Sequence, residues 1–267
     1  MSPPPPRSDL ADVNGLRIAY EVRGDEGTPL VLLHGGYGTT ASVAHLADPL
    51  SQHRTVISAD LQGHGRTADI DRPLSFHSLG DDIAALARHL GHERVDVMGY
   101  SLGGSSSLRC AIQHPDLVRK LVVVSSPFGS GGWYPELFEQ MQSMDRRGFE
   151  MMQHTPLFAD YAAVAPDPEG FPALMDKMGA LLGTPYDWRD EVTASTVPTL
   201  LVFGDADSIP PTHAAEFFAL LGGGRSDGSW DRSGVPASRL AVLPDTTHYD
   251  ILASPLLVPV VTAFLDA

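Results

Sequence analysis

The sequence predicts an α/β fold with a mostly parallel, doubly wound sheet that is covered by helices on both faces and interrupted by an inserted helical lid. Short, wholly apolar strand patterns alternate with helix patterns along the chain, as expected for strands that are buried on both sides. The length of 267 residues is sufficient for one large domain with a sizeable core and an insertion. We therefore expect one core domain.

Regular elements are expected in the following order along the chain. An antiparallel hairpin should form around Asn14-Gly15, because this dipeptide is typical of tight hairpin turns. Its two strands are residues 10–13 and 16–23, and the later strands are 30–33, 55–59, 95–98, 121–125, 199–203 and 239–243. Helices are expected at 40–51, 78–91, 105–114, 212–221 and 254–266. Proline at position 255 suits a helix start, whereas Pro259 should make the first turn irregular.

One connection is much longer than a usual crossover. About seventy residues, 127–196, separate two expected strands, whereas most connections span only a few residues. Helix-like pieces at 136–147, 148–153 and 168–182 are broken by prolines, including Pro156. We interpret residues 127–196 as the helical lid. Residues 10–126 and 197–267 then form the core, residues 1–9 a disordered proline-rich tail, and residues 222–234 a surface loop.

Composition and charge exclude several classes of partner. The formal net charge of −15 argues against binding to nucleic acid or to an anionic membrane surface, since both need clustered Lys and Arg. Cys110 is the single cysteine, so no cysteine-based metal site is expected. The chain has no secretory signal pattern and no apolar run long enough to span a membrane. We expect a cytoplasmic protein; its oligomeric state stays open.

The most informative motif is Gly99-Tyr-Ser-Leu-Gly103. It lies between a strand pattern and a helix pattern, which is the setting of a nucleophile elbow. Such a turn holds Ser101 in a strained backbone conformation and presents its hydroxyl above the sheet edge. Glycines two residues on either side allow the strand and the helix to approach closely. Ser101 is therefore the expected nucleophile.

A serine nucleophile needs a base and an acid, which should follow later strands in the order acid and then histidine. His248 follows the last expected strand and is the expected base. The strand at 199–203 leads into Gly204-Asp205-Ala206-Asp207. We expect Asp207, further into the loop, to be the acid, and Asp205 to cap the turn. The alternative acid position, after the strand at 121–125, offers Ser125 and Ser126 but no carboxylate.

Two N–H groups should stabilise the oxyanion of the tetrahedral intermediate. One is expected from Leu102 at the helix start. The other should come from the glycine-dense loop after the strand at 30–33, with Gly36 as the first choice and Tyr37 as the alternative. His34 and His64 are interpreted as structural residues of turns, and no metal ligand set is expected around them.

The chain resembles the α/β-hydrolase superfamily, especially its small lidded serine esterases. The resemblance is carried by His34-Gly-Gly, Asp60-x-x-Gly-His-Gly, Gly99-Tyr-Ser-Leu-Gly-Gly, Gly204-x-x-Asp207 and the late His248. Gly35-Gly-Tyr-Gly-Thr-Thr, Asp60-Leu-Gln-Gly-His-Gly-Arg-Thr and the loop at 222–234 are also similar to bacterial esterases with chloramphenicol or florfenicol amide hydrolase relatives. Because residue 101 is Ser and not Asp, dehalogenase and epoxide hydrolase chemistries are disfavoured.

These motifs predict a cofactor-free carboxylic ester hydrolase that acts on a small-molecule ester through an acyl-enzyme. The alternatives are an amidase on compact N-acyl substrates, carbon–carbon bond hydrolysis, a cofactor-free perhydrolase and a ligand receptor without turnover. Six of the eight methionines lie within residues 127–196. Because methionine can line pockets for varied apolar groups, we expect an apolar acyl pocket with Trp133, Met141 or Met144 in its wall.

Overall fold

The computed structural model describes residues 6–267 and contains one eight-stranded sheet. The strands, in chain order, are β1 (Arg7–Val13), β2 (Leu16–Arg23), β3 (Leu30–Leu33), β4 (Val56–Ala59), β5 (Val95–Tyr100), β6 (Val118–Val124), β7 (Thr199–Ala206) and β8 (Arg239–Thr247). Their order across the sheet is β1-β2-β4-β3-β5-β6-β7-β8. Strands β3 to β8 are parallel, and β1 and β2 are antiparallel. The predicted α/β class is confirmed.

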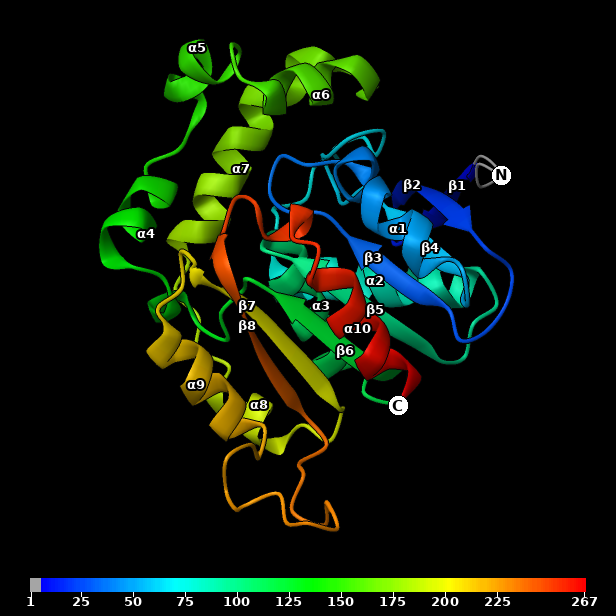
Figure 1. The fold of residues 1–267 in the computed structure, drawn as a ribbon. Helices are drawn as coiled ribbons and strands as arrows, with labels where there is room; N and C mark the ends of the chain where they lie inside the picture. Colours follow the sequence, from blue (N-terminus) through cyan, green and yellow to red (C-terminus); the bar gives the residue numbers. More distant parts are fainter. Residues whose placement is uncertain (1–5) are drawn as a thin grey trace.

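Helices cover both faces of this sheet (Figure 1). One face carries α1 (Ala44–Leu50) and α10 (Leu257–Asp266), and the other carries α2 (Phe76–His89), α3 (Leu102–Gln113), α8 (Arg189–Ala194) and α9 (Pro211–Leu220). Short 3-10 turns lie at Thr40–Val43, Ser130–Gly132, Arg146–Gly148, Pro168–Gly170 and Ile251–Ala253. Along β3, Val31 and Leu33 join one apolar cluster, whereas Leu30 and Leu32 join the other. This double burial explains why the strand has no polar residue.

The two ends of the chain differ from expectation. Residues 7–9 are not part of a tail, because they belong to β1, where Asp9 lies opposite Tyr20. Their side chains are exposed, so the backbone pairing with β2 forms this edge strand despite its polar sequence. Residues 1–5 of the expected tail lie outside the described residues. The last helix begins at Leu257, not at residue 254, which places Pro259 in its first turn, where its missing N–H is not needed.

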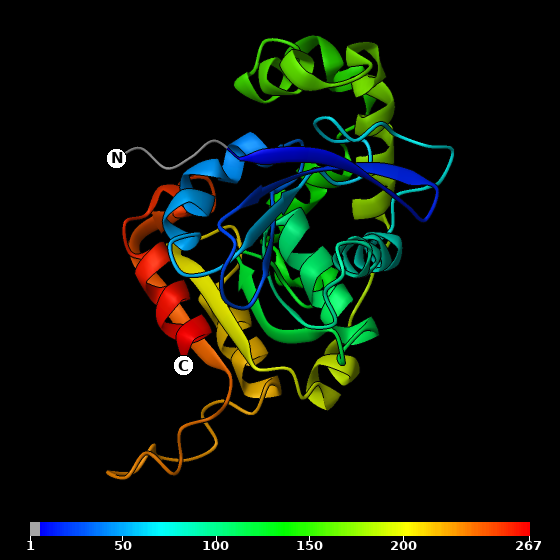
Figure 2. The ribbon, with the colours of Figure 1, turned by 90° about the vertical axis from the view of Figure 1, so that its right-hand side faces the viewer.

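The long connection between β6 and β7 holds a group of helices, and we call residues 127–196 the inserted segment. It comprises α4 (Pro135–Gln142), α5 (Phe149–Met152), α6 (Pro156–Val164), α7 (Phe171–Gly183) and α8. Helices α4 to α7 lie at the carboxyl ends of the strands, whereas α8 lies at the other end, beside α9 (Figures 1 and 2). Pro156 begins α6 instead of breaking a helix, because proline is tolerated at the first helical position.

Besides its apolar contacts, helix α7 is fastened to the core by a polar side chain, that of Lys177. The Nζ atom of Lys177 donates to the carbonyl oxygens of Ile70 (2.6 Å) and Arg72 (2.9 Å), and lies 2.6 Å from Oδ2 of Asp69. All three acceptors belong to the loop that follows β4. Lys177 therefore holds α7 over this loop by an ion pair and two charge-assisted hydrogen bonds.

In the described part of the chain, no helix is long and apolar enough to cross a membrane.

Substitution of Lys177 tests this fastening. Lys177→Gln removes the charge, so we expect the amide protons of α7 to exchange faster with solvent, with a loss of about 1–3 kcal/mol in the free energy that protects them. Hydrogen-exchange mass spectrometry measures this. Arg147→Gln is the matched control, because Arg147 is exposed and, within residues 6–267, its ion pair is with Asp145 of its own segment. Equal exchange of α7 in both variants would show that Lys177 does not fasten it.

Candidate active site

The turn from β5 to α3 has the strained geometry of a nucleophile elbow. Ser101 has φ 52° and ψ −116°, a backbone conformation that residues other than glycine rarely adopt. A Cβ on Gly99 would lie 2.1 Å from the carbonyl oxygen of Gly103, and one on Gly103 would lie 2.4 Å from that of His34. The two glycines therefore permit α3 to pack directly against β5 and the end of β3.

Three side chains from three strand ends meet at this turn. Nε2 of His248 lies 3.2 Å from Oγ of Ser101, and Nδ1 of His248 lies 3.1 Å from Oδ1 of Asp207. Because the carboxylate can only accept, Nδ1 carries the proton and Nε2 is free to accept the serine proton. Asp207 and His248 directly follow β7 and β8, and both are buried. The structure thus brings together the three residues that the sequence indicated.

The carboxylate of Asp207 is held on both oxygens. Its Oδ2 accepts from Oγ of Ser125 (2.5 Å) and from the N–H of Gly204 (3.0 Å), while Oδ1 faces His248. Burial by itself would raise the pKa of Asp207, but hydrogen bonds from His248, Ser125 and Gly204 outweigh it and hold the pKa below its usual value. Asp207 therefore stays ionised.

Asp205 has a different role from Asp207. Its side chain is exposed, and Oδ1 accepts from the N–H of Thr246 at 3.1 Å, which links the ends of β7 and β8. The hydrogen bonds from Thr246 and its backbone neighbours lower the pKa of Asp205. Asp205 thus caps the turn, as the sequence indicated, and leaves Asp207 as the carboxylate next to the histidine.

The glycine-dense loop after β3 lies against the nucleophile. A Cβ on Gly35 would be 3.4 Å from Cβ of Ser101. His34 holds this loop: Nδ1 donates to the carbonyl oxygen of Gly35 (2.7 Å), and Nε2 accepts from the N–H of Leu61 (3.1 Å). Leu102 is the first residue of α3 and directly follows Ser101, so its N–H lies at the N-terminus of this helix. The assignment of Leu102 and of Gly36, with Tyr37 as alternative, to the oxyanion hole stays a prediction that this proximity favours.

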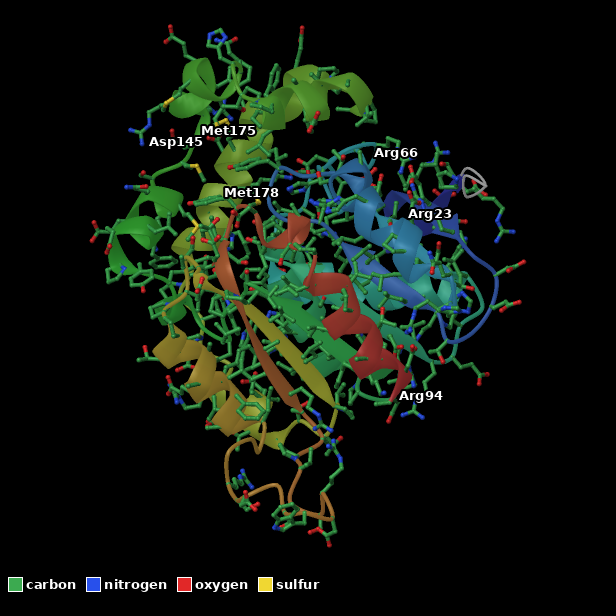
Figure 3. The ribbon with its side chains drawn as sticks, viewed as in Figure 1. Arg23, Arg66, Arg94, Asp145, Met175 and Met178 are labelled. Atoms are coloured by element: carbon green, nitrogen blue, oxygen red, sulfur yellow. The ribbon has the colours of Figure 1, made fainter. Side chains whose placement is uncertain are left out.

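The second glycine-rich loop supports the first. The buried Asp60 accepts from the N–H of Thr40 (2.7 Å) and from the backbone N and Nε of Arg66, which is labelled in Figure 3. Burial lowers the pKa of His64 to about 3, and its Nδ1 bonds the carbonyl oxygen of Gln62. These contacts fit the structural interpretation of His64. Within residues 6–267, no group of three or more His, Cys, Asp or Glu side chains is placed to hold a metal ion.

Two side chains of the inserted segment border the site. The ring of Trp133 lies 5.5 Å from that of His248, at an interplanar angle of 70°. Met178 on α7 places its Cε 3.1 Å from where a Cβ of Gly36 would be. In Figure 3 Met178 lies nearer to the sheet than Met175 does. The sequence contained no signal that selects Met178 among the methionines, because its position depends on how α7 docks.

The other two expected wall residues, Met141 and Met144, come from the end of α4 and the residues just after it, where the carbonyl oxygen of Met144 packs against Gly179 of α7. Their place in a pocket wall stays a prediction. The role of Tyr100 could not be predicted from the sequence: its hydroxyl donates to the carbonyl oxygen of His248 at 2.7 Å. This bond anchors the backbone of the histidine.

Comparison with known proteins agrees with this geometry. The family described as alpha/beta hydrolase fold matches residues 28–155. An uncharacterised protein of Mycobacterium tuberculosis is 24% identical over 98% of this chain and 82% of its own length. The crystal structure of E-2-(acetamidomethylene)succinate hydrolase has a TM-score of 0.77 at 22% identity, covering 98% of this chain and 100% of that one. A thermophilic esterase from Thermogutta terrifontis has a TM-score of 0.72 at 20% identity, covering 98% of both chains.

The close packing at the elbow can be tested by adding one methyl group. Gly99→Ala places a Cβ against the backbone of Gly103, so we expect the free energy of unfolding in urea to fall by about 3 kcal/mol or more. Gly183→Ala is the control, since a Cβ there meets no atom within 4 Å. A Gly99→Ala variant as stable as this control would show that the elbow tolerates a wider spacing.

Proposed function

We propose that this chain, a hydrolase of the α/β-hydrolase superfamily, is a serine carboxylesterase that cleaves esters of small to medium apolar acyl groups. The observation that carries the proposal is the continuous hydrogen-bond chain from Asp207 through His248 to Ser101. A serine hydroxyl is a weak nucleophile at neutral pH, and this arrangement supplies both the base and the group that orients it.

The proposed reaction uses only groups of this chain and a water molecule. Nε2 of His248 removes the proton of Ser101 while Oγ attacks the acyl carbon, and the N–H groups of Leu102 and Gly36 receive the oxyanion. The histidine then returns its proton to the leaving alcohol. Water, activated by the same histidine, releases the acid and restores Ser101. Throughout, Asp207 stays ionised and stabilises the imidazolium.

The residues around the triad support an apolar acyl group. Trp133 and Met178 come from the inserted segment, both are buried, and they contact His248 and the loop at Gly36 respectively. We propose that the inserted segment acts as a lid that encloses the acyl group between these side chains. Ligands of open α/β sheets bind at this carboxyl edge, which agrees with the placement.

Amide hydrolysis by the same three residues is the second candidate. It is favoured by the similarity to E-2-(acetamidomethylene)succinate hydrolase, and it would act on compact N-acyl substrates such as chloramphenicol-type amides. An amide has a poorer leaving group, so turnover depends on how well His248 protonates the amine. The same triad also permits perhydrolysis. A panel of p-nitrophenyl esters and matched anilides separates these activities, and a receptor would release at most one equivalent of product.

Substitution of the triad tests the proposal directly. Ser101→Ala and Asp207→Asn should each lower kcat by about 10⁴-fold, the first by removing the nucleophile and the second by favouring the wrong imidazole tautomer. Asp205→Asn is the matched control and should alter stability with little effect on kcat. An organophosphonate should label the peptide that contains Ser101. Labelling of another serine, or a larger loss from Asp205→Asn than from Asp207→Asn, would require a new assignment.

The acyl pocket is tested with esters of increasing chain length. Met178→Ala should shift kcat/KM from acetyl and butyryl esters toward octanoyl esters by about tenfold, because truncation of methionine enlarges an apolar site. Met144→Ala tests the residue that the sequence indicated. Met151→Ala is the control, because Met151 is 75% exposed. A preference for the succinyl ester, or superposed profiles for wild type and both pocket variants, would contradict a pocket built by the inserted segment.

A further inference from the structure

Ser125 is a buried residue with a strained backbone at the carboxyl edge of the sheet. It directly follows β6, has φ 49° and is fully buried. A positive φ is unfavourable for serine, and such strain persists only where the surroundings enforce it. Here the N–H of Ser125 donates to the carbonyl oxygen of Val202 in the neighbouring strand β7 at 2.9 Å. The main chain of Ser125 is therefore fixed by the sheet.

This backbone conformation is accompanied by one specific side-chain contact. Oγ of Ser125 donates to Oδ2 of Asp207 at 2.5 Å, the short distance typical of a hydroxyl bound to a charged carboxylate. The same oxygen accepts from the N–H of Gly204. The other oxygen faces Nδ1 of His248. Two donors on Oδ2 thus set the rotation of the carboxylate and the direction in which Oδ1 points.

We propose that Ser125 is a positioning residue for the reaction, whose hydroxyl holds the Asp207 carboxylate in the orientation that directs its free oxygen at His248. This inference rests on the proposed hydrolytic function. Ser125 does not touch the substrate or the reacting atoms. It acts through Asp207, which must stabilise the imidazolium each time His248 takes up a proton, in acylation and in deacylation alike.

The neighbouring Ser126 provides a matched comparison. It is as fully buried as Ser125, but its Oγ pairs with Oγ of Ser105 in α3 at 2.6 Å, away from the triad. Loss of a buried hydroxyl is therefore common to Ser125→Ala and Ser126→Ala, whereas loss of a hydrogen bond to Asp207 occurs only in the first.

Substitution by alanine and by glycine separates the hydroxyl from the backbone. Ser125→Ala removes the hydroxyl and keeps the unfavourable φ, whereas Ser125→Gly removes the hydroxyl and also relieves the strain. We expect both variants to lower kcat by about ten- to a hundredfold, the effect of removing one hydrogen bond to a charged group. KM should change by less than about twofold. Ser126→Ala should keep kcat within about twofold of wild type.

The decisive measurement is a double-mutant cycle with Asp207→Asn, using a p-nitrophenyl ester and active-site titration. If Ser125 acts through Asp207, adding Ser125→Ala to Asp207→Asn should lower kcat by less than about twofold further. A full ten- to hundredfold loss in this background, or wild-type kcat in Ser125→Gly, would overturn the inference. If Asp207→Asn is impaired but Ser125→Ala is not, this inference alone fails. Full activity of Asp207→Asn would overturn the proposed acid as well.

Discussion

The close contact between α3 and the ends of β3 and β5 is the constraint on which the site depends. Gly99 and Gly103 leave no room for a side chain, and the N–H of Gly103 donates to the carbonyl oxygen of His34 at 3.1 Å. This bond joins the elbow to the loop of Gly35 and Gly36, so Ser101 and the glycine-dense loop after β3 are parts of one packed unit. A helix further from the sheet would separate them.

The same edge of the sheet is connected from strand to strand by two backbone hydrogen bonds and one hydrogen bond to a side chain. The N–H of Ser101 donates to the carbonyl oxygen of Val124 at 3.0 Å, and that of Ser125 donates to Val202 at 2.9 Å. Asp205 then accepts from the N–H of Thr246. The ends of β5, β6, β7 and β8 are thereby tied to one another in order across the sheet. The distances among Ser101, Asp207 and His248 consequently depend on strand pairing, including the register shift between β7 and β8 at Gly204 to Ala206.

The features that could be predicted from the sequence are those encoded locally. Apolar runs indicated the six parallel strands, and the order of Ser101, Asp207 and His248 after successive strands indicated which side chains meet. Ser125 and Met178 could not be singled out, because their roles arise from contacts with residues far away in the chain. The strand at residues 7–9 was missed for a similar reason, since its polar side chains give no pattern and β2 supplies the pairing. The start of α6 was missed because Pro156 can either begin or end a helix.

Backbone strain is present around the site, at Tyr37, Ser101 and Ser125. All three have positive φ without being glycine, and all lie at the carboxyl edge of the sheet. Such conformations cost about 1–3 kcal/mol each, in a domain whose net stability is on the order of 5–15 kcal/mol. For thermal stability alone, glycine or asparagine would therefore be the better residue at these positions, because both tolerate a positive φ. Glycine would relieve this strain, but it would also remove the Ser101 and Ser125 hydroxyls that the proposed reaction uses, so stabilising substitutions are better sought away from this edge.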